Sequence, residues 1–324
     1  MNKKVKWGIL GCGKIAQKFA LDLAKVENAE LYAVASREQQ KANDFANRYN
    51  FKFAYNAYNL LAKDKLVDAI YIATPHVFHK ENTILCLKHK KAVLCEKPFA
   101  MNLGEVTEMI TVAKENNVLL MEALWTYFLP HYQFLLEVFQ SKKYGELLEL
   151  KADFGFKPFK NQLNDRLFKK SLGGGSLLDI GIYPIFAALS TLGKPESINA
   201  NATFFENGAD SSCDISFNYK NAKAELHSTL LAETPTEAIF TFEKAKVTIH
   251  TRFHEPTTVS IVTANTTETK DFNYKTIGYS YEIEHFNQLL RNHKIESNLM
   301  TYEFSKTLIQ TLDNVREKIG LTYS

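Results

Sequence analysis

The chain has 324 residues, which suggests two domains, and its 45% apolar and 23% charged residues are typical of a globular protein. The net charge of +3 is too small to indicate nucleic-acid binding, and the densest basic run, residues 88–91, is not interleaved with aromatic residues. The four cysteines show neither CxxC pairing nor metal-ligand spacing, which favours free thiols in a reducing compartment. We therefore expect a cytoplasmic protein with no metal site, nucleic-acid partner or membrane segment.

Residues 4–122 alternate between short apolar runs and amphipathic segments. The runs KVKWGIL, AELYAVA, VDAIYIATP, KAVLCE and NVLLME are rich in Val, Ile, Leu and Tyr and predict β-strands. Helical patterns such as Ile15, Phe19 and Leu23 lie between them. This alternation predicts an α/β domain with a doubly wound parallel sheet, a Rossmann domain over residues 1–123.

The first predicted strand ends in the motif Gly11-x-Gly13-x-x-Ala16, which opens a helix. The first glycine allows a tight turn, the second lets a pyrophosphate approach the backbone, and Ala16 lets the helix pack closely. The phosphates would lie at the positive N-terminal end of the helix, beside Lys14 and Ile15. The strand, turn and helix together predict a dinucleotide site.

The second predicted strand ends at Ser36 and Arg37, where a site that prefers NAD usually carries an acid. A hydroxyl and a guanidinium suit the 2′-phosphate of NADP, because arginine binds phosphate with a fork of donors. We therefore predict NADP as the cofactor. NAD is the alternative, with Arg37 a solvated loop residue and Glu38 supplying the acid.

Two further turns follow predicted strands, at the carboxyl ends where ligands of such sheets bind. His76 and His79, in ATPHVFH, are candidates to touch cofactor or substrate, with helix capping or simple exposure equally open. Lys97, in LCEKPFA, ends an apolar strand, where lysine rarely stands without a partner. A surface turn is the alternative for Lys97.

The pattern changes after residue 145. Seven runs with short turns between them follow, several of them alternating apolar and polar residues as antiparallel strands do: GELLELKADFGF, ESINANATFF, CDISFNY, AELHSTLLA, AIFTFE, KVTIHTRF and TTVSIVTA. Helical segments near 281–292 and 300–319 close the chain. We predict an α+β domain over 124–324 with a large, open, mainly antiparallel sheet, its C-terminal helix able to pack back on the first domain. An apolar sheet face must be covered, so we expect a homodimer or homotetramer formed through it.

The stretch LGGGSLLDIGIYP, residues 172–184, lies before most of those strands. Three glycines are entropically costly, so a site that keeps them usually needs close backbone approach or unusual dihedrals. Asp179 and Tyr183 would share one face of a helix, and Pro184 indicates a kink or break there. A flexible loop before an ordinary helix is the alternative.

Taken together, the GxGxxA turn, EKP and GGGSLLDIGIYP resemble the Gfo/Idh/MocA oxidoreductase family. The resemblance covers nearly the whole chain, including the late YEIEHFNQLLRN and MTYEFSKTLIQTLDNVREKIGL. Many members carry histidine where this chain has Tyr183. The tyrosine and MEALWTYFLP are closer to the branch of dimeric dihydrodiol dehydrogenase, NADP-dependent D-xylose dehydrogenase and glucose–fructose oxidoreductase.

The resemblance implies hydride transfer between NADP and a secondary alcohol of a cyclic substrate, a pyranose sugar or a trans-dihydrodiol. Tyr183 would be the acid/base, and Lys97 the cation that assists it. An ammonium about 4 Å away, at an effective dielectric of about 20, contributes roughly 4 kcal/mol and would bring a phenol pKa from about 10 to about 7. Asp179 would bind the substrate or orient Lys97, and the glycine loop would let its helix approach the nicotinamide. The alternatives are an inositol-type NAD-dependent dehydrogenase and a non-catalytic dinucleotide sensor.

The expected site residues fall into three groups. The catalytic residues are Lys97, Asp179 and Tyr183. The cofactor-binding residues are Gly11, Gly13, Lys14, Ile15, Ala16, Ser36, Arg37, Thr74, Pro75, His76, His79, Glu96, Lys97 and Arg166. The substrate-binding residues are Trp125, Phe154, Asp179, Tyr183 and Tyr279, whose aromatic members would form a flat pocket by the same resemblance; a core role is the alternative for Phe154 and Tyr279.

Overall fold

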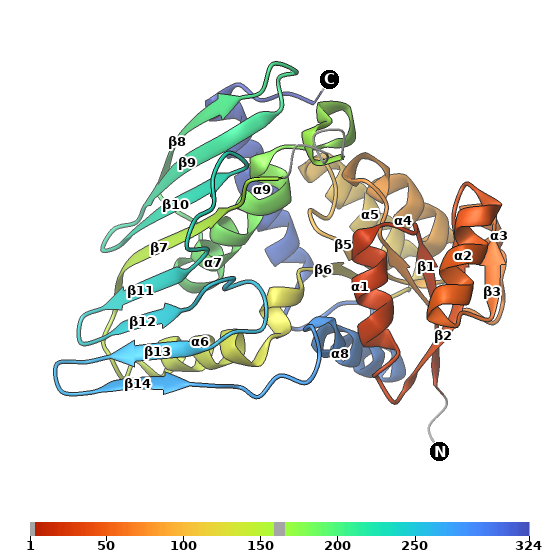
Figure 1. Cartoon of the computed structure of the whole chain (residues 1–324), viewed down its shortest axis with the longest axis horizontal. Coiled ribbons are helices and arrows are strands. Elements are labelled where there is room, and N and C mark those ends of the chain that lie inside the picture. The colour runs from red at the N-terminus through yellow and green to blue at the C-terminus, as the bar shows by residue number, and fades with distance from the viewer. Residues whose placement is uncertain (1–3, 159–165, 324) are drawn as a thin grey trace. The chain divides into compact units, whose positions relative to one another are not determined.

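A computed structural model of the chain describes residues 4–158 and 166–323, which form two compact units (Figure 1). Unit 1 is Met1–Phe128 with Lys275–Lys306, and unit 2 is Leu129–Tyr274 with Thr307–Ser324. Residues 275–306, assigned from the sequence to the second domain, thus belong to the unit of the first sheet.

Unit 1 is built on a six-stranded parallel sheet with the strand order β3-β2-β1-β4-β5-β6. Its strands are β1 (Val5–Leu10), β2 (Ala29–Ala35), β3 (Phe53–Tyr55), β4 (Ala69–Ile72), β5 (Ala92–Glu96) and β6 (Leu120–Ala123). Every residue of β4, β5 and β6 is buried, which explains the continuous apolar runs of the sequence. The strand order is that of a doubly wound Rossmann sheet, so the predicted fold of this part is confirmed.

The edge strand β3 was not predicted. It has three residues, and Phe53 at its start is 45% exposed, so neither length nor alternation marks it as a strand. The helices of unit 1 are α1 (Lys14–Leu23), α2 (Gln39–Tyr49), α3 (Tyr58–Lys63), α4 (His79–Lys88), α5 (Leu103–Asn116) and α8 (Tyr279–Arg291).

The late helix α8 is tied to the first strand and the first helix of unit 1. The indole of Trp7 donates to the side-chain oxygen of Asn287 at 3.0 Å. The buried carboxylate of Asp22 accepts from the backbone N–H groups of Ile277 and Ser280, each at 3.2 Å. Residues from the end of the chain therefore complete the core that residues 4–128 begin.

Unit 2 is built on an eight-stranded sheet with the order β14-β13-β12-β11-β7-β10-β9-β8. Its strands are β7 (Leu147–Gly155), β8 (Ser197–Phe204), β9 (Asp210–Asn218), β10 (Lys223–Thr229), β11 (Ala238–Phe242), β12 (Lys246–Ile249), β13 (Val259–Val262) and β14 (Thr267–Lys270). All neighbours are antiparallel except β7 and β10, which confirms the predicted mainly antiparallel sheet. The sequence missed β14, because all four of its residues are exposed.

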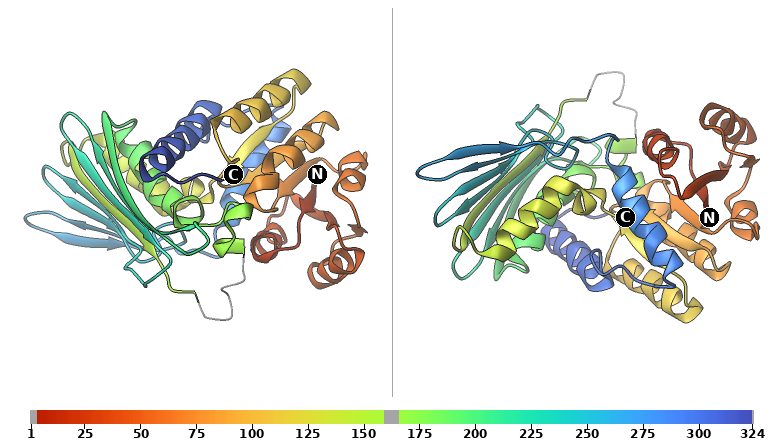
Figure 2. Two further views of the ribbon diagram at one scale, coloured as in Figure 1. Left: turned by 90° about the horizontal axis from the view of Figure 1, so that it is seen from above. Right: turned by 90° about the horizontal axis from the view of Figure 1, so that it is seen from below.

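The two faces of this sheet differ in chemistry. Helix α7 (Ile182–Leu192) packs on β7 and β10, and α6 (Pro130–Ser141) and α9 (Tyr302–Ile319) lie on the same side of the sheet (Figure 2). The other face is polar and contains a shallow cavity of about 300 Å³, lined by Lys151, Asp153, Asn201, Asp214, Glu225 and His227 among others. The apolar face that led us to expect self-association is therefore covered within the unit, and the homodimer or homotetramer stays a prediction.

One helical run of the described residues, Lys170–Leu192, is long and apolar enough to cross a membrane. Its most apolar window is 94% buried inside the structure, as expected of a core helix.

Candidate active site

The turn after β1 has the features of a dinucleotide-binding loop. Gly11 has φ +98°, and a Cβ there would lie 2.7 Å from the carbonyl oxygen of Ala73, so only glycine fits. A Cβ at Gly13 would meet no atom of the described residues within 4 Å. Protein packing therefore does not explain Gly13, and the approach of a pyrophosphate to this residue stays a prediction. Helix α1 begins at the next residue, Lys14, and directs its N-terminal end at this space.

The end of β2 presents the groups predicted to meet the adenosine ribose. Ser36 is buried, and its hydroxyl accepts from the backbone N–H of Glu38 at 3.3 Å. The guanidinium of Arg37 lies 5.9 Å from the ring centroid of Phe78. Glu38 is exposed, and its carboxylate pairs with Lys41 at 2.6 Å. Glu38, the acid that would bind the ribose if the cofactor were NAD, is thus paired with Lys41.

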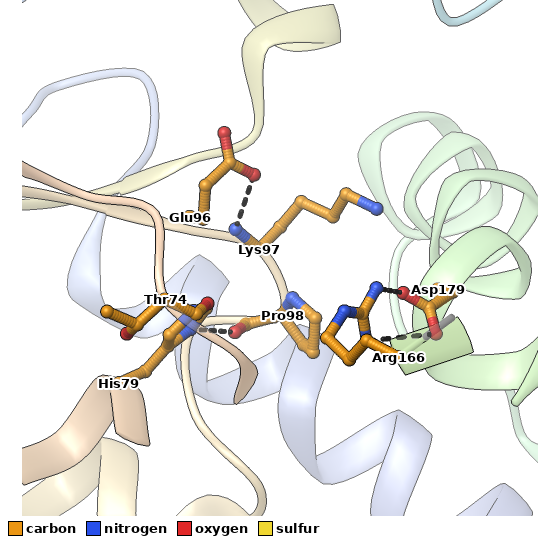
Figure 3. Close-up of polar contacts among 7 residues, drawn as sticks. All are labelled: Thr74, His79, Glu96, Lys97, Pro98, Arg166 and Asp179. Atoms are coloured by element: carbon orange, nitrogen blue, oxygen red, sulfur yellow. Dashed lines mark hydrogen bonds and ion pairs between the residues drawn. The ribbon is translucent and has the colours of Figure 1, made fainter. Parts of the chain in front are cut away.

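His79 has a supporting position that the sequence did not predict. It is fully buried, and its ring nitrogens lie 2.9 Å from the carbonyl oxygen of Pro98 and 2.8 Å from that of Thr74 (Figure 3). The ring of His79 therefore lies between the carbonyl groups of two loops of unit 1 and can donate to one of them, and its predicted contact with cofactor or substrate stays a prediction. The hydroxyl of Thr74 accepts from Asn82 at 3.1 Å, which fixes the same loop.

Glu96 turns into the protein at the end of β5. The hydroxyl of Tyr71 donates to one carboxylate oxygen of Glu96. The backbone N–H of Lys97 donates to the other oxygen at 3.2 Å (Figure 3). The following peptide, Lys97–Pro98, is cis. Phe99 then donates its backbone N–H to the buried carboxylate of Glu122 at 3.0 Å. Glu96 thus positions the turn that carries Lys97, and its predicted contact with the cofactor stays a prediction.

The predicted aromatic residues divide between the units. Trp125 and Tyr279, both in unit 1, stack with ring centroids 4.3 Å apart and an angle of 15°. They are 5% and 3% exposed. Phe154 belongs to unit 2, where it lies beside Tyr183. The structure therefore brings together two of the three aromatic residues expected to converge.

The glycine run of unit 2 is explained by packing within that unit. Gly175 has φ +145°, and a Cβ there would collide with the side-chain oxygen of Asp210. A Cβ at Gly174 would collide with the backbone carbonyl oxygens of Arg166 and Leu167. Asp210 is fully buried and accepts from the backbone N–H of Leu177 at 2.5 Å. The glycines thus let a buried carboxylate hold the start of the helix that follows.

That helix begins with a π-helical turn, Leu177–Gly181, which continues into α7 at Ile182. The change of helix type lies two residues before Pro184, inside one continuous helical run, and a proline there interrupts the regular series of backbone hydrogen bonds. Asp179, 5% exposed, accepts from both terminal nitrogens of Arg166, one of them at 3.2 Å (Figure 3). Arg166 is therefore bound to Asp179, and its predicted contact with the cofactor stays a prediction.

Tyr183 lies in a cluster of three buried rings that come from distant parts of unit 2. Its ring centroid is 5.7 Å from that of Phe154 and 4.7 Å from that of His254. The rings of Phe154 and His254 stack at 4.1 Å with an angle of 25°. His254 was missed by sequence reasoning, because it follows β12 in a loop without any local pattern that points to a site.

Within residues 4–158 and 166–323, no cluster of three or more His, Cys, Asp or Glu side chains could hold a metal ion. Burial raises the pKa of Cys12, in the glycine turn, to about 11, so it is a neutral thiol at physiological pH.

Comparison with known proteins gives the family. The family described as "Oxidoreductase family, NAD-binding Rossmann fold" matches residues 5–124, and the "GFO/IDH/MocA C-terminal domain" matches residues 132–255. The chain therefore belongs to the Gfo/Idh/MocA family, and it is a dehydrogenase that uses a nicotinamide cofactor and acts on alcohol groups.

Individual relatives cover the whole chain. The trans-1,2-dihydrobenzene-1,2-diol dehydrogenase of Xenopus tropicalis is 34% identical, over 98% of this chain and 99% of the relative. The scyllo-inositol 2-dehydrogenase (NADP(+)) of Bacillus subtilis is 31% identical, over 98% of each chain. Among solved structures, a 3-ketoreductase from Actinomadura kijaniata in complex with NADP and TDP-benzene superposes with a TM-score of 0.88, at 25% identity over 98% of each chain.

Proposed function

We propose that the protein is an NADP-dependent dehydrogenase that oxidises or forms a secondary alcohol on a cyclic substrate, a pyranose sugar, a cyclitol or a trans-dihydrodiol. Tyr183 is the acid/base and Lys97 the assisting cation. The observation that carries this proposal is the position of Tyr183 and Asp179 in consecutive helical turns, both at least nine-tenths buried, with Arg166 bound to Asp179.

The roles of the side chains follow from their chemistry. When bound, NADP supplies the acceptor for the hydride that leaves the alcohol carbon. Tyr183 takes the proton of the alcohol hydroxyl in that direction and returns it to the carbonyl oxygen in the other. A free phenol has a pKa of about 10, so a nearby ammonium is needed to make it a useful base, and Lys97 is the proposed source of that charge. Asp179 orients a substrate hydroxyl, and its pairing with Arg166 holds its carboxylate in one place.

The preference for NADP rests on Ser36 and Arg37. Arg37 is exposed at the end of β2, while the neighbouring carboxylate of Glu38 pairs with Lys41. A guanidinium there favours a phosphate, because it binds phosphate oxygens with a fork of donors. The Bacillus relative, named as an NADP(+) enzyme, and the NADP complex of the Actinomadura 3-ketoreductase support the same choice.

The test is a screen of NADP⁺ and NAD⁺ reduction by the purified protein against pyranoses, inositols and trans-1,2-dihydrobenzene-1,2-diol. Turnover of at least one cyclic alcohol with a preference for NADP⁺ is the expected result. Turnover of inositols with NAD⁺ preferred would instead identify an inositol-type NAD enzyme. Tight NADPH binding without turnover of any substrate would identify a dinucleotide sensor.

A further inference from the structure

Tyr71 is a buried polar side chain of unit 1 that the proposed proton transfer does not use. It lies on β4, is 0% exposed, and its ring stacks on that of Phe19 with centroids 3.6 Å apart and an angle of 6°. Phenylalanine would fill this place equally well, whereas a buried phenol is costly unless its hydroxyl is hydrogen-bonded. The hydroxyl of Tyr71 donates to a carboxylate oxygen of Glu96, at the end of the neighbouring strand β5.

Glu96 connects this hydroxyl to the turn that carries Lys97. Its other carboxylate oxygen accepts from the backbone N–H of Lys97 at 3.2 Å (Figure 3). Glu96 is 9% exposed, so both bonds are made largely out of contact with water, where hydrogen bonds to a carboxylate are strong. Each carboxylate oxygen of Glu96 therefore has a donor, and the link runs from Tyr71 through Glu96 to the backbone of Lys97.

The phenol of Tyr71 is the donor in this link. Burial, and after it the negative charge of Glu96, raises the pKa of Tyr71 well above its usual 10, so the hydroxyl keeps its proton. Burial is also the main cause that raises the pKa of Glu282, on α8, well above the usual 4.5 and favours its neutral form. The titratable groups around this pair come from α1, β6 and α8: Asp22, Glu122, Tyr279 and Glu282.

The direction of the Glu96 side chain matters, because the residue next to it in the chain is the proposed cation. Successive side chains of a strand point to opposite faces of the sheet, and the Lys97 side chain extends away from the carboxylate of Glu96 (Figure 3). A carboxylate that turned onto the ammonium of Lys97 would offset its positive charge. The hydrogen bond from Tyr71 opposes that turn, because it holds the carboxylate inside unit 1.

We propose that Tyr71 is a positioning residue for Lys97, because its bond to Glu96 keeps that carboxylate on the backbone N–H of Lys97 and away from the ammonium. This inference rests on the proposed function, since it takes the charge of Lys97 as the one that assists Tyr183. Loss of the Tyr71 hydroxyl should therefore change the proton-transfer step more than it changes the binding of cofactor or substrate.

The experiment is a double-mutant cycle on Tyr71 and Glu96 in the whole protein. We would measure kcat, KM and the pH–rate profile for NADP⁺-dependent oxidation of the best cyclic alcohol of the screen in the wild type, Tyr71→Phe, Glu96→Gln and the double variant. Glu96→Gln keeps an oxygen for the N–H of Lys97 but has no charge that could offset the ammonium. Tyr55→Phe is the matched control, because the hydroxyl of Tyr55 donates to the carboxylate of Asp64 at 2.8 Å, also within unit 1.

We expect Tyr71→Phe to lower kcat by about tenfold and to keep KM and the dissociation constant of NADPH within about threefold, because a misplaced catalytic group mainly slows the chemical step. The acidic limb of its profile should move to higher pH by about 0.5–1 unit, since an offset ammonium assists the phenol of Tyr183 less. In the Glu96→Gln background, Tyr71→Phe should change kcat by less than about twofold. Tyr55→Phe should leave both kcat and the profile as in the wild type.

Four results would overturn the inference while leaving the proposed function intact. They are an unchanged kcat in Tyr71→Phe, an acidic limb that stays in place, an equal loss in Tyr55→Phe, and a loss from Tyr71→Phe that is the same with and without Glu96→Gln. If Tyr71→Phe alone does not fold, the Glu96→Gln background gives the answer: a further loss of about tenfold there would overturn the inference, and a loss below about twofold would support it. Turnover at the wild-type rate in Lys97→Met would overturn the proposed function itself, and this inference with it.

Discussion

Tyr183 is the residue at which the proposed chemistry is most sensitive to a single atom. Tyr183→Phe removes the phenolic oxygen but keeps the ring that packs against Phe154 and His254. We expect kcat to fall by about two orders of magnitude or more, since acid/base groups contribute roughly 10²- to 10⁴-fold. The dissociation constant of NADPH, measured by fluorescence titration, should stay within about twofold.

Lys97→Met should resemble Tyr183→Phe in kcat and should also move the acidic limb of the pH–rate profile for alcohol oxidation to higher pH, because the phenol loses the charge that assists its ionisation. Turnover close to the wild-type value in both variants would exclude this pair as the proton-transfer machinery.

Arg37 is where cofactor preference should reside. Arg37→Ala should raise the dissociation constant of NADP(H) by about 10- to 100-fold, because one charge-assisted contact is worth about 1.5–3 kcal/mol. NAD(H) should bind nearly as before, since it lacks the 2′-phosphate. Calorimetric titration with both cofactors measures this, with Glu38→Ala as the control at the neighbouring position. Equal losses for NADP(H) and NAD(H) after Arg37→Ala would contradict the assignment.

The roles that could be predicted from the sequence are those that depend on residues adjacent in the chain. The spacing of Gly11 and Gly13 is a local property of the chain, and Gly13 in the structure has the open space that the motif implies. The bridge made by His79 and the place of His254 depend on contacts with segments 19 and 100 residues away, at Pro98 and Phe154, so no local pattern shows them.

At the scale of elements, the glycine run and the π-helical turn that follows it both pack against the buried carboxylate of Asp210. Gly175→Ala should lower the free energy of unfolding by more than about 3 kcal/mol, because the new Cβ meets both an unfavourable φ and the buried carboxylate. Gly320→Ala is the matched control, with φ +68° and no atom of the described residues within 4 Å of the added Cβ, and should cost about 1 kcal/mol. Urea denaturation measures both.

If both glycine variants lost the same free energy of unfolding, the role given to Asp210 would be contradicted. A further check is Asp210→Ala, which should reduce the cost of Gly175→Ala when the two changes are combined, since contacting residues are not additive.

Strands were predictable where burial leaves a pattern in the sequence. The fully buried strands β4 to β6 read as apolar runs, and most strands of unit 2 show alternation. The short edge strand β3 and the exposed strand β14 bury too little to leave either pattern. The π-helical turn Leu177–Gly181 could not be predicted, because its first residue donates a hydrogen bond to Asp210, which lies on the distant strand β9.

At the scale of the whole molecule, the sequence placed one boundary near residue 123, whereas the compact units are each made of two stretches of the chain. The amphipathic pattern of α8 predicts a helix with one buried face but does not say which core receives that face. The answer lies in the hydrogen bond from Trp7 to Asn287 and in the bonds from Ile277 and Ser280 to Asp22, which span more than 250 residues.

The stability of the molecule should depend on pH through Glu122 of unit 1. This side chain is 2% exposed, and burial raises its pKa to about 7 from the usual 4.5. The folded state therefore keeps a proton that the unfolded state releases between about pH 4.5 and pH 7. Stability must fall as pH rises through this window, by about 3 kcal/mol from this group alone.

Glu122→Gln removes that titration and keeps an oxygen that can accept from Phe99. Relative to the wild type, the variant should therefore gain about 3 kcal/mol of unfolding free energy between pH 4.5 and pH 8. Both tryptophans of the chain, Trp7 and Trp125, lie in unit 1, so fluorescence during urea denaturation reports on the unit that contains Glu122. Glu38→Gln, at an exposed carboxylate of the same unit, is the control and should leave the pH dependence as it is. If the difference between Glu122→Gln and the wild type were the same at both ends of this pH range, Glu122 would be ionised in the folded protein and the predicted dependence would be wrong.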